Sequence, residues 1–290
     1  MSGDWVGQTL LSGSQTRVSG PPAPYLPLAT MNDITITDAC VLFALRREAR
    51  AFLQEFRPQE RFPGAPCRAR FCGPEWLTVL VLETGIGQKR TEEALRWLLA
   101  KPVLVNVPYQ PKVVISCGFA GALQPDLQVG DLVLATEVVD TEGHSWPVPW
   151  PGALPPGDWQ PPLKRGRLLT TPQLITNPAQ KRELGQRHQV LAVDMESAIV
   201  ASICSRQEIS FGCLRAISDR VDTAMSPQLI SVLSGAGVSW IRLAAMLARS
   251  PLSTGELWRL AKATRVASRE VAKGLGELLT LTLPWDTDQE

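Results

Sequence analysis

The stretch "KVVISCG" (residues 112–118) decides the fold class of this chain. It is a continuous apolar run of strand length that ends in a glycine, as expected for a strand buried on both faces of a sheet. Comparable runs occur on either side of it, at residues 39–45, 77–83, 131–139, 166–171, 190–195 and 212–218. Helical segments fill several of the gaps between these runs. We therefore expect an α/β protein with a mixed, mostly parallel central sheet that is covered by helices on both faces.

Two of the intervening segments have clear helical periodicity. They read "RREARAFLQEF" (46–56) and "QKRTEEALRWLLA" (88–100), and Pro102 limits the continuation of the second. Residues 1–36 are instead rich in Ser, Gly and Pro, which predicts a disordered N-terminal tail, with Met31 as an alternative start. We expect the catalytic domain to span residues 37–236.

The C-terminal extension, residues 237–290, is predicted to be helical. Its apolar residues recur at three- and four-residue spacing, with an interruption at Pro251. Between residues 238 and 283, seven Lys and Arg stand against three Glu, a net charge of +4. Two interpretations follow: amphipathic helices that pack on the sheet, or a basic face that meets a membrane surface.

Composition excludes several classes of function. The net charge is +1 over 290 residues, and no basic run with interleaved aromatics suggests nucleic-acid binding. The six cysteines show no CxxC spacing and lie mostly in apolar runs, so we expect a reducing compartment, hence the cytoplasm. The two histidines have no partner at metal-ligand spacing, so no metal and no cofactor are expected. We find neither a signal peptide nor an apolar run of transmembrane length.

One segment breaks the alternation of strands and helices. "HSWPVPWPGALPPGDWQPP" (144–162) carries seven prolines and three tryptophans, so it cannot be a central strand or helix. The ordinary interpretation is a surface loop. The alternative is a lid or a wall of a substrate site, because long loops in compact domains are often functional.

Carboxylates follow several of the predicted strands. In parallel α/β sheets, ligands bind at the carboxyl ends of strands, and here those ends carry Glu48, Asp194 with Glu196, and Asp219. Each carboxylate alone has an ordinary explanation. Glu48 suits the first turn of a helix, Asp219 suits a helix N-cap, and Asp194 could be a buried, hydrogen-bonded group. Together they indicate a site.

The motifs of the chain resemble a known superfamily. "FALRREARAF", "GIG", "SCGFAGALQPDLQVGDLVLATEV", "AVDMESAIVA" and "LRAISDRVD" occur in the order found in the purine nucleoside phosphorylases and nucleosidases. Within it the chain resembles the methylthioadenosine/S-adenosylhomocysteine nucleosidases over residues 39–225. The segment "SPQLISVLSGAGVSWIRLAAMLARSPLSTGELWRLAKATR" (226–265) resembles the tail of hopanoid-associated phosphorylases. The resemblance implies a three-layer sandwich of the nucleoside phosphorylase type.

The resemblance also implies roles for individual residues. Glu196 matches the glutamate that accepts hydrogen bonds from the ribose hydroxyls, and Met195 matches the methionine that packs against the sugar. Asp219 matches the aspartate that gives a proton to purine N7, with Ser218 as its support. Glu48 matches the glutamate that positions and deprotonates the attacking water.

Three further positions follow from the same resemblance, and a fourth, Gly87, follows from the glycine pattern itself. Arg215 matches an arginine beside the nucleophile, Ile175 matches a backbone contact to the base, and Gly87 allows close approach of the backbone to a ligand. Phe119 stands where the nucleosidases carry a serine that helps to hold the water, which puts the water geometry in question.

The identity of the nucleophile follows from the charges around the expected site. The related hexameric phosphorylases hold phosphate with an arginine and a serine where this chain has Ser116 and Phe119, and Glu48 would repel a phosphate dianion. Water is therefore favoured over phosphate. Lys89 and Arg90 could still serve an anion, although a solvated helix face is the simpler interpretation.

Three functions remain open from the sequence. The first is hydrolysis of the N-glycosidic bond of an adenine (purine) nucleoside, with a 5′-alkyl or hopanoid substituent as an option. The second is a phosphate-dependent phosphorylase. The third is a catalytically silent nucleoside-binding or membrane-associated protein. By resemblance we expect a homodimer, with peripheral membrane contact through the C-terminal tail.

Overall fold

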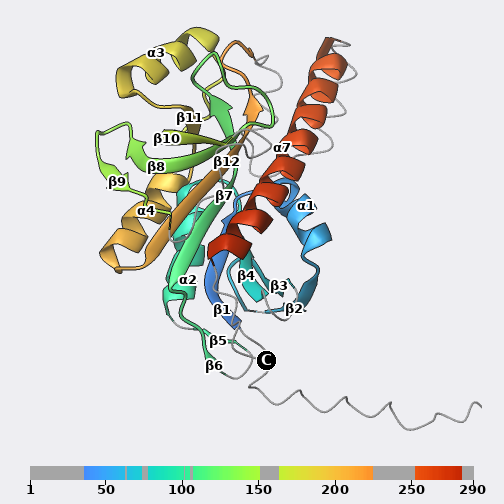
Figure 1. Ribbon diagram of the computed structural model, residues 1–290, viewed down its shortest axis with the longest axis vertical. Helices are drawn as coiled ribbons and strands as arrows, with labels where there is room; N and C mark the ends of the chain where they lie inside the picture. Colours follow the sequence, from blue (N-terminus) through green and yellow to red (C-terminus); the bar gives the residue numbers. More distant parts are fainter. Residues whose placement is uncertain are drawn as a thin grey trace, which may run out of the picture. The chain divides into compact units, whose positions relative to one another are not determined.

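The computed structural model describes residues 36–62, 64–73, 78–100, 102–104, 107–150, 163–224 and 252–282. They all belong to one compact unit, Thr35–Glu290 (Figure 1). The predicted disordered tail lies almost entirely outside the described residues, as do residues 151–162 of the Trp/Pro segment. The expected boundary between residues 236 and 237 also lies outside them, so the division into a catalytic domain and an extension stays a prediction.

All seven predicted strands are present. They are β1 (Ile36–Phe43), β4 (Thr78–Glu83), β7 (Val113–Ala122), β8 (Leu132–Asp140), β10 (Leu163–Thr170), β11 (Ala192–Asp194) and β12 (Ser210–Asp219). The short strands that the apolar pattern did not predict are β2 (Pro58–Arg61), β3 (Arg68–Cys72), β9 (Ser145–Pro147) and the separate β5 (Val103–Leu104) and β6 (Val107–Pro108) pair. β9 pairs only with β8 among the described strands, as an edge position requires of a proline-rich segment.

The sheet is mixed, as expected, and part of it closes on itself. Its order is β11-β10-β8-β12-β7-β1-β4-β3-β2, and β11 pairs additionally with β7. This last pairing joins β7, β12, β8, β10 and β11 into a ring. β4, β1, β7 and β12 run parallel to one another, whereas β11 is antiparallel to β7 and β8 is antiparallel to β12.

Helices cover both faces of the sheet (Figure 1). On one face lie α1 (Arg46–Glu55) and α7 (Leu252–Thr282), which pack against each other and against β12 and β7. On the other lie α2 (Gln88–Leu99) and α4 (Ser197–Arg206). The fifth helix of the described residues is α3 (Pro178–His188). β1 shows why both layers exist: Val41 and Phe43 pack into one core, and Cys40 and Leu42 into the other.

Within residues 252–282, α7 packs on the sheet, as the first of the two interpretations of the C-terminal extension expects. It begins directly after Pro251, and one of its faces is buried through Val271, Leu275, Leu278 and Leu279. The region before it, residues 225–251, lies outside the described residues. Of the helices in the described part of the chain, none has both the length and the apolar character needed to cross a membrane.

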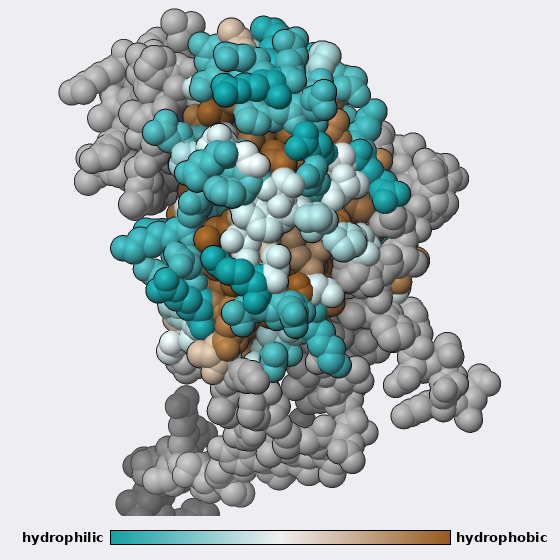
Figure 2. All heavy atoms as spheres, turned by 90° about the vertical axis from the view of Figure 1, so that its left-hand side faces the viewer, coloured by the Kyte–Doolittle hydropathy of each residue, from teal (hydrophilic) through white to brown (hydrophobic). Residues whose placement is uncertain are grey.

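The surface agrees with this burial of apolar side chains in two cores. The side of the molecule that carries α3, α4 and β9 is mainly hydrophilic, with small apolar areas between the polar side chains (Figure 2). Of the six cysteines, five are buried, as predicted for core residues.

Candidate active site

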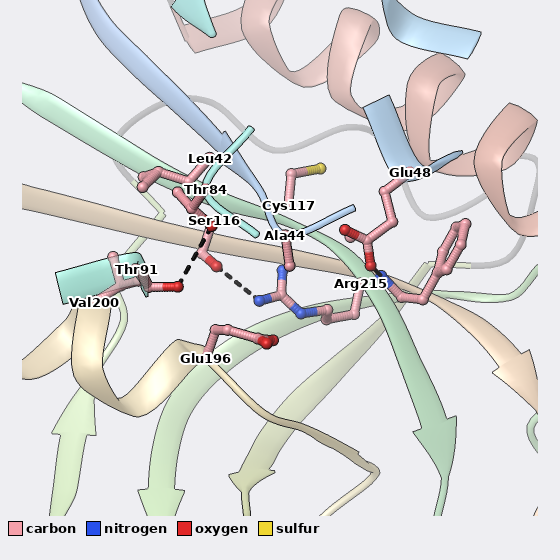
Figure 3. Close-up of a pocket in the computed structure, with 12 residues that line it drawn as sticks. Leu42, Ala44, Glu48, Thr84, Thr91, Ser116, Cys117, Glu196, Val200 and Arg215 are labelled. Carbon is pink, nitrogen blue, oxygen red and sulfur yellow. Dashed lines mark hydrogen bonds between the residues drawn. The ribbon is translucent and has the colours of Figure 1, made fainter. Parts of the chain in front are cut away.

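A pocket lies where β1, β7, β12 and the start of α4 meet (Figure 3). It collects residues that are far apart in the sequence. The lining residues are Leu42, Ala44, Glu48, Thr84, Thr91, Ser116, Cys117, Gly118, Phe119, Glu196, Val200 and Arg215. Nine of these come from the motifs quoted in the sequence analysis, and they include the predicted site residues Glu48, Phe119, Glu196 and Arg215.

The strand register explains why these residues meet. β1 ends at Phe43 opposite Cys117 of β7, and Glu48 follows shortly after. β11 runs the other way and places Val193 opposite Gly121, so its carboxyl end points back toward the middle of β7. β12 brings Arg215 opposite Gly118. The two carboxyl ends therefore approach the same segment of β7 from opposite directions, which the assumption of parallel strands does not give.

Glu48 has two roles in the structure. It is the third residue of α1, and its Oε2 accepts a hydrogen bond of 2.7 Å from the N–H of Leu45 at the start of that helix. Its Oε1 accepts one of 3.1 Å from the N–H of Phe119. Burial raises the pKa of this carboxyl, and the two N–H donors and Arg215 oppose that rise. The helix-end interpretation and the functional one therefore both hold for this residue.

Gly118 allows Glu48 to occupy this place. A Cβ on Gly118 would lie 2.9 Å from the carboxyl carbon of Glu48, closer than real Cβ atoms approach. The absence of a side chain at Gly118 therefore lets the Glu48 carboxyl group lie directly against β7.

Asp194 is a fully paired structural group. Its Oδ2 accepts hydrogen bonds from Arg215 Nη2 at 2.7 Å and from Ser197 Oγ at 2.6 Å, and its Oδ1 accepts one from Thr170 Oγ1 at 2.7 Å. A buried carboxylate is tolerated only with such partners. The prediction of a buried, hydrogen-bonded group is confirmed, and Asp194 is absent from the pocket lining.

Arg215 is held rigidly between the carboxylates of the pocket. Besides Asp194, its guanidinium donates to Ser116 Oγ at 2.7 Å, to Ser197 Oγ at 2.8 Å and to the carbonyl of Leu214 at 3.0 Å. Figure 3 shows the guanidinium between the side chains of Glu48 and Glu196. Since most of its donors are already engaged, Arg215 offers little to a further anion.

Glu196 faces the pocket, two residues after Asp194. Its Oε1 accepts a hydrogen bond of 2.8 Å from the N–H of Gly87, which precedes α2 with a φ of 97°. Burial, and next the charge of Asp194, raise its pKa from 4.5 to about 8, against the stabilising N–H of Gly87. Within the described residues, neither Glu196 nor Glu48 forms an ion pair, so the pocket holds two carboxyl groups without a cation of their own.

Asp219 belongs to a second cluster, outside the lining of the pocket. It ends β12, and no helix follows it directly, so the N-cap interpretation is wrong. Ser218 Oγ donates to Asp219 Oδ1 at 2.7 Å, as the supporting role predicted. Lys181 Nζ forms a short, buried ion pair with Asp219 Oδ2. Sequence reasoning missed Lys181, because it sits in no motif and meets its partner only in the fold.

The remaining predicted site residues border these two clusters. Met195 is half-buried directly after β11, and Ile175 is half-buried against a small core that includes Leu123 and Val193. Neither lines the pocket. Phe119 does line it, and it contributes its backbone N–H to Glu48.

The α2 end of the pocket contributes hydroxyl groups that the sequence analysis did not select. Thr84 Oγ1 lies 3.4 Å from Thr91 Oγ1, and both residues line the pocket. Lys89 and Arg90 are exposed, which agrees with a solvated helix face, although the Arg90 side chain packs against Gly85. The sequence signal that could have identified Thr91 is its position one turn into a helix that follows a glycine loop.

One group of possible metal ligands exists in the described part of the chain. Asp140, Glu142 and His144 bring their ligand atoms within 4.8 Å of one another at the β8–β9 turn. The His144 ring nitrogen already lies 2.8 Å from Asp140, and the backbone N–H groups of Glu142 and His144 donate to the same carboxylate. These hydrogen bonds close the turn between β8 and β9, and they explain why the three side chains lie close together.

Comparison with known proteins places these features in a family context. A family model described as "Phosphorylase superfamily" matches residues 38–233. The methylthioadenosine/S-adenosylhomocysteine nucleosidase of Bacillus thuringiensis is 27% identical over 204 residues, which cover 62% of this chain and 84% of the relative. The nucleosidase of Bacillus cereus strain B4264 is 28% identical over 204 residues, with the same coverage of both chains.

Solved structures share the fold at lower identity. The 5′-methylthioadenosine/S-adenosylhomocysteine nucleosidase of Helicobacter pylori superposes with a TM-score of 0.60 at 19% identity, covering 84% of this chain and 98% of that one. The futalosine hydrolase of the same organism gives 0.60 at 17% identity, with the same coverage. The family match ends at residue 233, so it leaves the resemblance of the tail to hopanoid-associated phosphorylases untested.

Proposed function

Because the chain belongs to the phosphorylase superfamily, as its motifs predicted, we propose that it is a purine nucleosidase that uses water. The substrate is an adenine nucleoside. A water oxygen forms a bond to C1′ of the ribose as the C1′–N9 bond breaks, and the bonding pair leaves with the purine. The proton of the water passes to Glu48, and the purine receives a proton at N7 from Asp219.

One observation carries this proposal: the pocket holds two carboxyl groups, and its arginine is already occupied. Glu48 and Glu196 flank Arg215, whose donors are engaged by Asp194 and Ser116. A phosphate dianion needs free cationic donors and would meet two acidic groups here. A water molecule needs an acceptor for its proton, which Glu48 provides.

The other carboxyl suits the sugar and the charge that develops on it. A ribose presents two adjacent hydroxyl donors, and a carboxylate only accepts hydrogen bonds. Glu196 holds one oxygen on Gly87 N–H, which leaves the other oriented for a hydroxyl. As the bond to the base breaks, the sugar becomes oxocarbenium-like. Glu196 stabilises that positive charge in its carboxylate form, which gains population as the pH approaches its pKa of about 8. Met195, adjacent in sequence, is assigned to the apolar face of the sugar.

The base end of the site is assigned to the second cluster. Asp219 with Ser218 lies at the end of β12 beside β7, and Ser218 Oγ lies 3.3 Å from the carbonyl oxygen of Ala120 on β7. Ile175 supplies a backbone contact to the base, since the segment between β10 and α3 borders this end of the ring of strands. The purine then spans from the pocket to Asp219.

The test is adenine release from adenosine, methylthioadenosine and a 5′-alkyl adenosine, with and without phosphate. We expect release without phosphate, with free ribose or its 5′-substituted form as the second product. The preferred 5′ group identifies the substrate. Strict phosphate dependence with a ribose 1-phosphate product would instead establish a phosphorylase and direct attention to Arg90. Absence of release from every substrate would favour a silent binding protein.

Finer features are proposals that rest on particular surfaces. The solvent-facing side of α7 exposes Trp258 to 67%, with Lys262 Nζ 5.6 Å from its ring centre, which suits peripheral contact with an anionic membrane and a lipid-like 5′ substituent such as a hopanoid. A flotation assay with acidic vesicles tests this through Trp258→Ala. Deleting the helix would be uninformative, because its other face is part of the core.

Two further assignments complete the proposal. The free, mostly buried cysteines suit a reducing compartment such as the cytoplasm. A homodimer is the oligomer we propose, and sedimentation equilibrium tests it.

A further inference from the structure

Lys181 is the most unusual charged residue outside the pocket. It lies in the first turns of α3, and its side chain has no exposed surface. Among the described residues it is the only buried lysine, and lysines are almost never fully buried unless they are paired. Most of the remainder of α3 is exposed or half-buried. The burial of Lys181 therefore does not follow from burial of the whole helix.

The contacts of Lys181 converge on the base end of the site. Its Nζ pairs with Asp219 Oδ2 and donates to the carbonyl of Arg220 at 2.9 Å. Ser218 donates to the other carboxyl oxygen. Asp219 thus has a donor on each oxygen, and one of the two is a cation that is shielded from solvent.

Stability alone does not explain such a pair. Withdrawing an ammonium and a carboxylate from water costs about as much as their attraction returns, and apolar residues of similar volume often stabilise a protein equally well. The pair also fixes one orientation of the carboxyl group, because Gly121 lies against it: a Cβ there would be 3.1 Å from Asp219 Oδ2. The arrangement therefore specifies where the carboxyl group points.

This arrangement matches what a proton donor to a leaving group requires. To act as the donor, Asp219 must first take up a proton from solvent. When it passes this proton to N7, it returns to the carboxylate state, which the structure surrounds with an ammonium and a hydroxyl donor. We propose that Lys181 is a positioning residue for Asp219, which orients it and stabilises the carboxylate that forms as the purine leaves. Lys181 keeps its own proton throughout, so the atom balance of the reaction is unchanged. This inference rests on the proposed function and deepens it.

The proposal predicts an effect that depends on the leaving group. Adenine is a poor leaving group and needs the proton, whereas 4-nitrophenolate leaves without one. Lys181→Met should lower kcat for adenosine by about 100-fold with a change in KM below about threefold, the range of a lost general-acid contribution. The same variant should cleave 4-nitrophenyl β-D-riboside within about twofold of the wild-type rate. A residue that only supports the fold would affect both substrates equally.

Further variants sharpen the test. Asp219→Asn should show the same selective loss, and the double variant should be no worse than Asp219→Asn, because the two residues act as a unit. Lys181→Arg should recover part of the adenosine activity by restoring the cation. Lys164→Met, at an exposed lysine that pairs with Asp126, should leave both rates unchanged. Circular dichroism and Tm establish that each variant is folded, and Lys181→Gln replaces Lys181→Met if the latter is not.

The outcomes separate this inference from the proposed function. Equal losses on both substrates, no loss on either, or additive losses in the double variant would overturn the role of Lys181. Failure of the wild-type protein to release adenine without phosphate would overturn the nucleosidase proposal itself, whatever Lys181 does.

Discussion

Replacing Glu196 by Gln should raise the free energy of unfolding relative to the wild type, and this difference should grow as the pH rises. The pKa of Glu196 is raised from 4.5 to about 8, so the native state holds a proton that the unfolded state has lost over most of this interval. The wild type therefore loses stability as the pH increases from about 4.5 to about 8. Gln carries no charge at any pH, and its side chain has nearly the same shape.

The size of the effect follows from the pKa. Each tenfold change in acid dissociation is worth about 1.4 kcal/mol, so a rise from 4.5 to about 8 corresponds to roughly 5 kcal/mol. We take this as an upper bound, because the charges of Asp194 and Glu48 contribute to the shift and can relax. At pH 5 the two proteins should unfold at similar free energies, and by pH 9 Glu196→Gln should be more stable by several kcal/mol.

The measurement is urea unfolding of both proteins between pH 5 and pH 9, followed by circular dichroism. Glu183→Gln, at an exposed position of α3, is the matched control and should run parallel to the wild type. At pH 8 and above, where Glu196 is ionised, adenine release should fall sharply in Glu196→Gln, because a neutral amide cannot stabilise the sugar cation. If the difference in unfolding free energy between Glu196→Gln and the wild type stays constant across this pH range, the reasoning about a half-buried carboxyl group that forms no ion pair is wrong.

The remaining predictions concern the proposed catalytic base Glu48, the buried ion pair of Asp194 with Arg215, and the contact of Gly185 in α3 with Leu123. Glu48→Gln should lower kcat for adenosine by about 10²–10⁴-fold while the protein stays folded, and unchanged steady-state kinetics would remove Glu48 from the mechanism. Asp194→Asn should lower the free energy of unfolding by about 3–5 kcal/mol, because it leaves Arg215 buried beside a neutral amide; urea unfolding checks this, and a loss below about 1 kcal/mol would contradict the pairing. Gly185→Ala should destabilise by about 1–3 kcal/mol, since its Cβ would lie 2.5 Å from the carbonyl oxygen of Leu123, and a Tm equal to that of the wild type would show that α3 can shift freely.

The sequence by itself determined the central strands and the main helices. Continuous apolar runs such as residues 112–118 indicate burial on both faces, which is a local property of the chain, and β7 is found there. The same holds for the end of α2 before Pro102 and for the start of α7 after Pro251. The polar strands β2 and β3 were not visible in this way, because cross-strand pairing and not an apolar pattern defines them.

Only the tertiary structure decided which acidic residue is paired inside the protein and which one faces the pocket. Asp194 and Glu196 stand two residues apart in one motif, yet the first is buried on Arg215 and the second faces the pocket. That difference depends on β11 running antiparallel to β7, a pairing across more than 70 residues that no local pattern records. Lys181 meets Asp219 for the same reason, because 38 residues and a change of direction separate them. Local sequence encodes which segments are buried, whereas the order and direction of strands determine which charges meet.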